Sequence, residues 1–285
     1  MLVNLNEILI PAQKGRYGVG FFNAVNVEMA RAIIETAEEM KAPVIVGTAE
    51  VLLKTTELVN VADYLIPMAK RASVPVCVHY DHGLTFERCM QALDLGFTSI
   101  MYDCSTLPYE ENTRQLRHMV GICHDRNVTV EGELGHVGDN EGSGRLERPE
   151  DYYTDPRQAE DYVRNTGVDA LAIAVGNAHG DYRFAPKLDF ERIHIIAQKT
   201  GIPLVLHGGS GLSDDDFTRA VAEGICKINI FTDIDKAGKT GTEKGIASGG
   251  RSMCDLIPYE IEAMKDVVRH KISLFMGRSH AYIDR

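Results

Sequence analysis

The stretch Val74-Pro75-Val76-Cys77-Val78-His79-Tyr80-Asp81-His82-Gly83 joins an apolar, β-branched run to a polar end in which a histidine precedes a glycine. The same combination recurs at Asn177-Ala178-His179-Gly180 and at Leu206-His207-Gly208-Gly209. Short runs of this composition are typical of buried strands. Because a parallel sheet or barrel brings the carboxyl ends of its strands to one face, we expect these three histidines to converge on one metal ion.

Strand-like and helix-like runs alternate along the chain. We expect eight strands, at Gly18–Ala24, Pro43–Thr48, Val74–Tyr80, Thr98–Asp103, Val128–Glu133, Ala170–Val175, Ile202–His207 and Ile225–Ile230. Amphipathic stretches separate them, at Val27–Lys41, Leu58–Arg71, Phe86–Leu95, Glu110–Arg126, Gln158–Thr166, Phe190–Lys199 and Asp214–Ala222. Eight such units predict an α/β fold, a (β/α)8 TIM barrel forming a single domain over residues 1–285 with a C-terminal helical extension from about residue 255. A doubly wound open sheet is the alternative.

Two segments interrupt the regular spacing. Leu134–Pro156 is polar and glycine-rich, and loops of this length inside compact domains are usually lids or binding loops. Lys236–Arg251 precedes a final helix expected at about Ile257 to Phe275. Its Lys, Gly, Ser and Thr content favours a solvated linker, whereas its position after the last strand would suit a closing flap.

The overall composition restricts the partners and the compartment. The 285 residues carry a formal net charge of −11 without a Lys/Arg run, which argues against nucleic acid or an anionic membrane as the main partner. The six cysteines form no C-x-x-C pair, so we expect reduced core thiols in a cytoplasmic protein. The N-terminus lacks the features of a signal peptide, and no apolar run approaches transmembrane length.

Nearly every expected strand ends in a polar residue at the same face. These are Asn23, Thr48, Asp81, His82, Asp103, Glu133, His207 and Asn229 to Thr232, with His179 in the loop after the sixth strand. Neutral imidazoles favour Zn²⁺ or a similar metal, and three protein ligands leave a coordination position open for a substrate oxygen. Asp81 beside the metal suits a base; the alternative is a carboxylate that orients an imidazole.

Two glycine-bearing turns predict a phosphate site. His207-Gly208-Gly209-Ser210-Gly211 leads into a helix that Ser213 is expected to cap, and Asn229-Ile230-Phe231-Thr232 leads into another helical start. Backbone N–H groups at such helix starts bind phosphate, and the loops after strands seven and eight form the usual phosphate site of these barrels. The alternative is a tight turn that needs glycine only for its backbone angles.

Five motifs follow one another along the chain: Asp81-His82, Glu131-Gly132-Glu133-Leu134-Gly135, Gly176-x-x-His179-Gly180, His207-Gly208-Gly209-Ser210-Gly211 and Lys227-Ile228-Asn229-Ile230-x-Thr232. Together they resemble the motif set of the class II, metal-dependent ketose-bisphosphate aldolases, whose members cleave fructose or tagatose 1,6-bisphosphate. The resemblance runs from about Gly18 to the C-terminal helix and so covers nearly the whole chain.

The resemblance implies a role for each matching residue. His82, His179 and His207 would hold the catalytic Zn²⁺, with Asp103 and Glu133 contributing to a second metal position. Asp81 and Glu141 would be the catalytic acids and bases. Substrate and its phosphate would be bound by Asn23, Gly180, Gly208, Gly209, Ser210, Asn229, Ile230, Phe231 and Thr232. The family also commonly uses a monovalent cation near the phosphate loops and forms homodimers or homotetramers.

The implied function is that of a lyase of carbohydrate metabolism, acting on a phosphorylated sugar. Zinc-dependent aldol cleavage or condensation of a phosphorylated ketose would give dihydroxyacetone phosphate and an aldehyde. Breaking the carbon–carbon bond leaves electrons on the carbon next to a ketone, and Zn²⁺ stabilises that enediolate as a Lewis acid. A carboxylate takes the proton from the hydroxyl that becomes the aldehyde.

Some residues depart from the better-known members. Phe231 occupies a variable position, Gly47-Thr48-Ala49 replaces a Gln-x-Ser, and residues 136–140 alter the loop before Glu141. The pocket for the aldehyde half therefore differs, and neither fructose nor tagatose bisphosphate is assumed as the substrate.

Two other functions remain open. Lys227 shares strand parity with Asn229 and would serve a Schiff-base aldolase if its amine were desolvated, although this leaves the three histidines unexplained. A non-catalytic barrel that supports an active aldolase is the other alternative.

Overall fold

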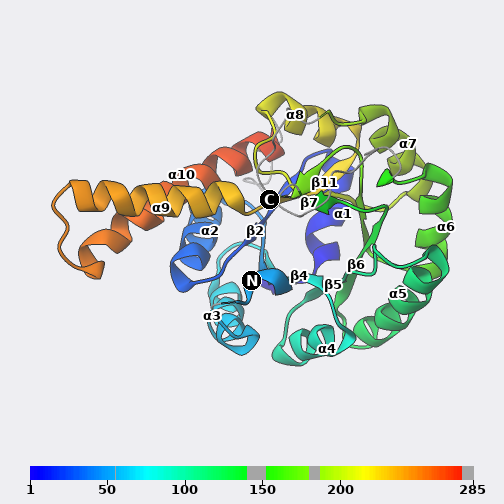
Figure 1. Ribbon diagram of the computed structural model, residues 1–285, viewed down its shortest axis with the longest axis horizontal. Coiled ribbons are helices and arrows are strands. Elements are labelled where there is room, and N and C mark those ends of the chain that lie inside the picture. The colour runs from blue at the N-terminus through cyan, green and yellow to red at the C-terminus, as the bar shows by residue number, and fades with distance from the viewer. Residues whose placement is uncertain (55, 140–151, 180–186, 278–285) are drawn as a thin grey trace.

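The structure, a computed structural model, describes residues 1–54, 56–139, 152–179 and 187–277 (Figure 1). Its strands close a parallel ring in the order β4, β3, β2, β11, β10, β8, β6 and β5, and β5 pairs again with β4. This confirms the predicted (β/α)8 barrel. The strands are β2 (Val19–Asn23), β3 (Val44–Ala49), β4 (Val76–Gly83), β5 (Ser99–Tyr102), β6 (Thr129–Leu134), β8 (Ala170–Ile173), β10 (Leu204–Leu206) and β11 (Ile225–Ile230).

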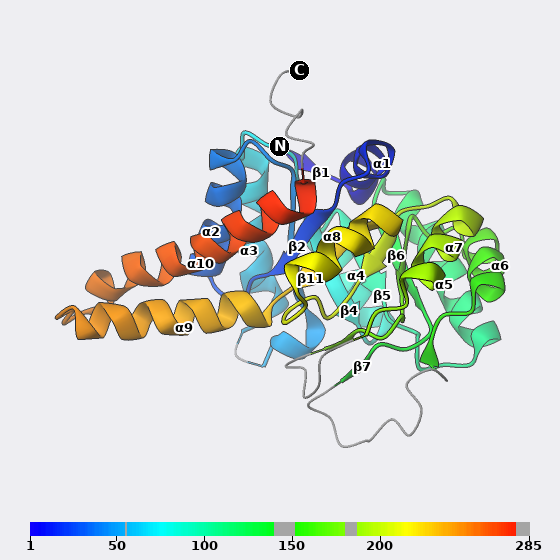
Figure 2. The same cartoon turned by 90° about the horizontal axis from the view of Figure 1, so that it is seen from above.

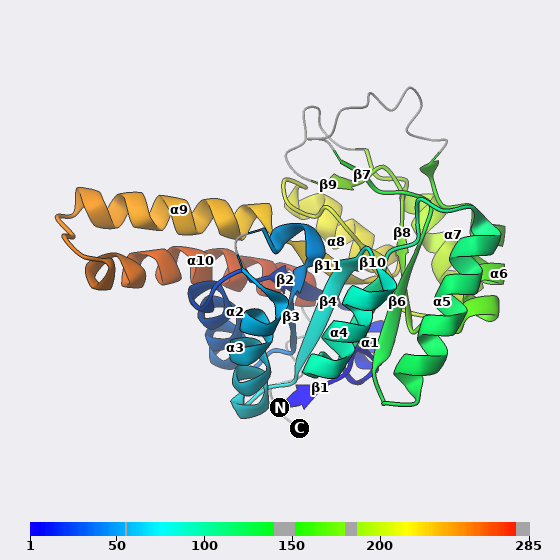
Figure 3. The ribbon, with the colours of Figure 1, turned by 60° about the horizontal axis from the view of Figure 1, so that its bottom comes forward.

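Helices surround the ring (Figures 1 and 2). They are α1 (Leu5–Gly15), α2 (Val27–Glu39), α3 (Leu58–Arg71), α4 (Phe86–Leu95), α5 (Tyr109–His124), α6 (Pro156–Thr166), α7 (Phe190–Thr200), α8 (Asp214–Glu223), α9 (Thr232–Ala247) and α10 (Met253–Met276), with a 3-10 turn, η1 (Glu50–Leu52). Ser213 caps α8 as expected, because its side chain accepts a hydrogen bond from the Asp216 amide. Helix α1 was not predicted from the sequence; it lies at the end of the barrel opposite β7 and β9 (Figure 3).

Three two-residue strands complete the sheets. β1 (Leu2–Val3) extends the barrel beside β4. β7 (Gly138–Asp139) and β9 (Ala178–His179) form a separate parallel ribbon, which Figure 3 places beyond the carboxyl ends of the barrel strands. The ribbon therefore joins the loop after β6 to the loop after β8 at the barrel mouth.

The barrel interior contains charge as well as apolar side chains. His79, Glu131 and Lys227 are each 0% exposed, on strands β4, β6 and β11. The Phe21 ring packs edge-on against His79 at 5.1 Å, and the Lys227 Nζ lies 4.5 Å from the centre of the same ring. A buried charge must be paired or hydrogen-bonded, so these residues point to the functional end of the barrel.

The prediction of a solvated linker at Lys236–Arg251 is wrong. Most of this segment belongs to α9, which packs against α10 as a helical hairpin that projects sideways from the barrel and not across its mouth (Figures 1 and 3). Gly238, Gly241 and Gly245 are buried in this contact. A Cβ at Gly241 would lie 2.4 Å from the Tyr259 carbonyl oxygen, so the glycines permit close helix packing where their composition suggested flexibility.

Five of the six cysteines are buried free thiols, as expected, but Cys254 is exposed on α10. In the described part of the chain, no helix combines the length and apolar character needed to cross a membrane.

The hairpin contact predicts opposite effects for two glycine substitutions. Gly241→Ala should lower the free energy of unfolding by about 1–3 kcal/mol, because the added methyl group overlaps a backbone carbonyl. Gly121→Ala on α5 is the matched control: a Cβ there meets nothing within 4 Å, so it should stabilise the helix by about 0.5–1 kcal/mol. Urea unfolding followed by circular dichroism measures both. Stabilisation by Gly241→Ala as well would contradict a close packing of α9 on α10.

Candidate metal centre and active site

A bulge at the end of β4 turns two adjacent side chains toward the same site. The pairing of β4 with β5 shifts register between Tyr80 and Gly83, and His82 adopts a φ of 45°, an uncommon value for a residue with a side chain. In a regular strand, neighbouring side chains point to opposite faces. Here the ligand atoms of Asp81, His82 and His207 lie within 4.8 Å of one another. The bulge therefore makes both Asp81 and His82 available at the barrel mouth.

Glu50 braces this bulge from the neighbouring strand connection. Its Oε2 accepts a hydrogen bond from the Tyr80 hydroxyl at 3.1 Å and another from the Leu84 amide at 2.7 Å. The two donors lie on either side of Asp81 and His82. Glu50 was not predicted as a site residue, since nothing in its local sequence indicates contacts 30 and 34 residues away.

His82 and His207 meet in a way that calls for a cation. The His82 Nε2 lies 2.8 Å from the His207 Nδ1. The other nitrogen of His82 lies 2.7 Å from Asp103 Oδ2, and that of His207 lies 2.8 Å from Glu131 Oε1. Ionised carboxylates only accept, so the nitrogens beside them carry hydrogens. When both rings are neutral, the two facing nitrogens present lone pairs to a metal ion; without a metal, burial opposes the charge of His82, but the surrounding carboxylates outweigh it, raise the His82 pKa and give this ring a positive charge. Imidazoles oriented by carboxylates in this way are typical of metal sites.

His179, the third predicted zinc histidine, belongs to the short ribbon beyond the barrel strands. It lies on β9 in register with Asp139 of β7, at the barrel mouth. The structure brings His82 and His207 together, and the role of His179 in the metal site remains a prediction.

Asp103 and Glu133 lie beside His82 and form a further candidate group with it. Burial, together with the negative charge of Asp103, raises the pKa of Glu133 to about 8. Burial opposes ionisation of Asp103 as well, but the hydrogen bond from His82 and its charge lower the Asp103 pKa. One Glu133 oxygen accepts a hydrogen bond from the Val137 amide at 3.1 Å. This arrangement suits the predicted second metal position, while Asp103 also orients His82.

Asp81 is held as a carboxylate by two amides. The Nδ2 of Asn23 and the Nδ2 of Asn229 each lie 3.2 Å from one of its oxygens. Burial alone would raise the Asp81 pKa, but the positive charges of His82 and Lys227 outweigh it and lower the pKa. A buried, ionised carboxylate beside a metal can accept a proton from a substrate hydroxyl.

A third group lies deeper in the barrel and was missed by the sequence reading. His79, Asp81 and Glu131 have ligand atoms within 4.8 Å of one another. His79 stands two residues before Asp81, and Glu131 two residues before Glu133, so each pair shares one face of its strand. This parity within apolar runs was the signal that would have identified them.

The predicted phosphate loops lie at the start of α9. The Ser210 hydroxyl accepts hydrogen bonds from the amides of Phe231 and Asp233, each at 3.3 Å. The Gly209 amide donates to the Asn229 carbonyl at 3.0 Å, and Gly208 has a φ of 62°. The N-cap residue of α9, Phe231, makes no side-chain capping hydrogen bond, and a helix N-terminus of this kind suits an anion. Gly180 and Glu141 lie outside the described residues.

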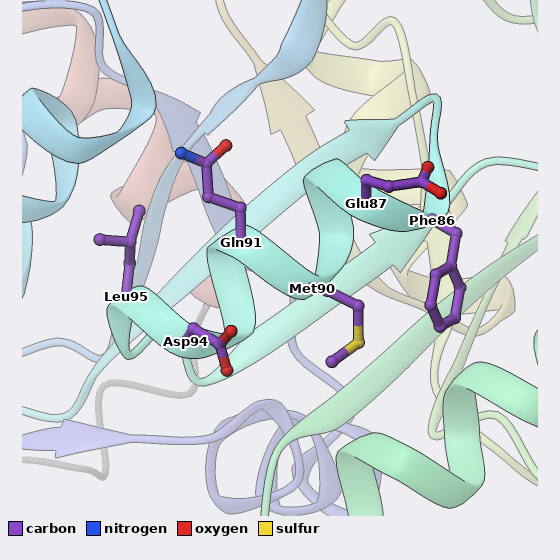
Figure 4. A pocket seen from close by; sticks show the side chains of 6 residues that line it. All are labelled: Phe86, Glu87, Met90, Gln91, Asp94 and Leu95. Atoms are coloured by element: carbon purple, nitrogen blue, oxygen red, sulfur yellow. The ribbon is translucent and has the colours of Figure 1, made fainter.

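A separate surface hollow lies along α4 (Figure 4). It is lined by Phe86, Glu87, Met90, Gln91, Asp94 and Leu95. None of these residues belongs to the candidate metal groups. The buried polar clusters, and not this hollow, locate the functional site.

Comparison with known proteins decides the family. Residues 3–280 match the family described as "Fructose-bisphosphate aldolase class-II". The chain belongs to the class II fructose-bisphosphate aldolase family. This confirms the resemblance inferred from the motifs, and the chain is accordingly an aldolase, a carbon–carbon lyase of a metal-dependent family.

Similar proteins agree over nearly the full length. The chain is 37% identical over 281 residues to a fructose-bisphosphate aldolase of Staphylococcus aureus, covering 96% of this chain and 97% of the relative. It is 43% identical over 240 residues to that of Geobacillus stearothermophilus, covering 81% of each. Among solved structures, the YdjI aldolase of Escherichia coli K12 gives a TM-score of 0.86 at 34% identity, covering 96% of this chain and 97% of that one.

The bulge in this aldolase yields a prediction for Glu50. Glu50→Ala should lower the affinity for Zn²⁺ roughly 10-fold, as is usual when a residue that supports a metal ligand is lost, because His82 loses the contacts that hold its backbone. Tyr80→Phe removes one of the two hydrogen bonds and should have a smaller effect. Competition with a chromophoric chelator measures the affinity. Unchanged zinc affinity in a folded Glu50→Ala variant would show that the bulge holds its shape without Glu50.

Proposed function

We propose that this aldolase uses one Zn²⁺ to cleave or form a phosphorylated ketose, with dihydroxyacetone phosphate and an aldehyde as the other reactants. The observation that carries the proposal is the 2.8 Å approach of two imidazole nitrogens, each ring oriented by its own carboxylate. The relatives are named for fructose bisphosphate. For this chain we propose the ketose bisphosphate class without a particular member, because Gly47-Thr48-Ala49 and Phe231 depart from the residues that the family usually has at these positions.

His82, His207 and His179 are the proposed zinc ligands. The first two already face one another, and β9 holds His179 at the same mouth. Zn²⁺ bound there would supply Lewis acidity for the negative charge that develops on the ketone oxygen. Asp103 and Glu131 fix the imidazole rings, and Asp103 with Glu133 forms the proposed second metal position.

Asp81 is the proposed base at the hydroxyl that becomes the aldehyde. In cleavage, its carboxylate takes the hydroxyl proton, the aldehyde carbonyl forms, and the electrons of the broken bond pass to the carbon next to the ketone. Asn23 and Asn229 hold the carboxylate during the transfer. Glu141, outside the described residues, is proposed to exchange the proton at that carbon.

The phosphate of the dihydroxyacetone phosphate half is proposed to bind at the N-terminus of α9. The proposed contacts are the backbone amides around residues 229–232, Gly208, Gly209 and the Ser210 hydroxyl, together with Gly180, which lies outside the described residues. A monovalent cation beside these loops belongs to the same proposal.

We also propose a cytoplasmic homodimer or homotetramer. The α9–α10 hairpin projects from the barrel and exposes large apolar side chains, with Ile246 58% and Met253 65% exposed. Apolar side chains on such a projection are typical of an interface. The five buried free thiols accord with a reducing compartment.

Metal dependence is the first test. Chelation should abolish cleavage of a ketose bisphosphate, and Zn²⁺ or Co²⁺ should restore it, because the metal and not a covalent intermediate stabilises the developing negative charge. A coupled assay for dihydroxyacetone phosphate measures the rate. If borohydride together with substrate inactivates the enzyme and labels Lys227, the reaction proceeds through a Schiff base and the proposal fails.

Two substitutions separate metal binding from proton transfer. Asp81→Ala should keep zinc near the wild-type content and reduce cleavage by at least ~10²-fold, the scale of a lost general base. His207→Ala should lose the metal itself. Zinc content by atomic emission, measured beside the cleavage rate, checks both. Equal zinc loss in the two variants would make Asp81 a support for the metal site.

A further inference from the structure

We propose that Lys227 is a positioning residue that orients both the metal ligand His207 and the base Asp81 from below the barrel mouth. Its side chain is 0% exposed on β11, two residues before Asn229, and so lies one layer deeper in the barrel. Through two short chains of hydrogen bonds, it reaches two groups that the proposed function uses differently. The inference rests on that function, and its test distinguishes the two.

One chain of contacts runs from Lys227 to the metal. The Lys227 Nζ lies 2.9 Å from Glu131 Oε2 and 3.3 Å from Oε1, and Oε1 accepts from His207 Nε2 at 2.8 Å. Glu131 and His207 are both 0% exposed. Lys227 compensates the buried carboxylate that fixes the His207 ring, so that the His207 Nδ1 faces His82. Without Lys227, Glu131 would have no such counter-charge, and its movement or hydration would release the ring.

The other chain of contacts runs to the base. The Lys227 Nζ donates to Asn229 Oδ1 at 2.7 Å, and Asn229 Nδ2 lies 3.2 Å from Asp81 Oδ1. A lysine ammonium has three donors and no acceptor, so the amide must turn its oxygen to Lys227 and its NH₂ to Asp81. The lysine therefore determines that the NH₂ group of Asn229, and not its oxygen, meets the Asp81 carboxylate. In the opposite orientation, the Asn229 oxygen would repel Asp81.

These contacts also argue against a nucleophilic lysine. The amine is enclosed by Glu131, Asn229 and the Phe21 ring, 4.5 Å from the ring centre. It lies below the residues proposed to contact substrate. A Schiff base would require the side chain to break both hydrogen bonds and move toward the mouth.

The first test compares Lys227→Met with Lys265→Met. Lys265 is also buried, and pairs with Glu35 at 2.7 Å and Glu39 at 2.9 Å on the helical layer, away from the metal groups. Both variants should lose folding stability in urea. Only Lys227→Met should lose Zn²⁺ affinity, by about 10–100-fold, alter the visible absorption spectrum of bound Co²⁺, and show a reduced kcat at saturating zinc.

The double variant Lys227→Met/Glu131→Gln separates the contacts that lead to His207 from those that lead to Asp81. It removes both charges, and the glutamine oxygen can still accept from His207. Folding stability and zinc affinity should recover toward wild type, whereas kcat at saturating zinc stays low, because Asn229 has no donor to hold it. If Lys227→Met alone does not fold, kcat and zinc affinity are measured on the double variant instead. Full recovery of kcat would show that Lys227 does not orient Asp81 through Asn229.

The outcomes distinguish this inference from the proposed function. If the wild type fails to bind Zn²⁺, the proposed function is wrong. If the wild type binds it and folded Lys227→Met matches the Lys265→Met control in zinc affinity, Co²⁺ spectrum and kcat, Lys227 serves only the fold and the inference is wrong.

Discussion

The pairing of Lys227 with Glu131 inside the barrel is the interaction on which the site depends. Both side chains are fully buried, and their ion pair measures 2.9 Å. Removing one partner of such a pair typically costs about 3–5 kcal/mol, because the remaining charge stays buried without compensation. An apolar pair would fill the same volume at less cost. The charges have a use in orienting two residues of the site, because Glu131 hydrogen-bonds to His207 and Lys227 hydrogen-bonds to Asn229.

The fold was largely predictable because its signal is local. The strand expected at Ile225–Ile230 has those bounds in the structure, as does the helix at Leu58–Arg71. Period and composition within ten residues were enough for such elements. They failed at α9, where the meaning of Gly241 depends on Tyr259 across the hairpin and not on its own neighbours in the chain.

The site was predictable only in its outline. Position at a strand end foretold that His82 and His207 would approach each other. It did not foretell the bulge that rotates His82 beside Asp81, nor Glu50 as its support, since register shifts and long-range braces depend on how two strands pair. The short ribbon that carries His179 was not predicted either, because β7 and β9 pair across two loops that are distant in the sequence.

The contacts beneath the mouth have a consequence for synthesis of the chain. Glu131 is translated 96 residues before Lys227, and Asp81 148 residues before Asn229. On the ribosome, seven strands of the barrel therefore exist while their central carboxylates still lack the cation and the amide that complete them. A nascent chain that closed its sheet early would trap uncompensated charge. The interior thus penalises premature closure until the eighth strand emerges, and the barrel gains a built-in order of assembly from the same groups that shape its active end.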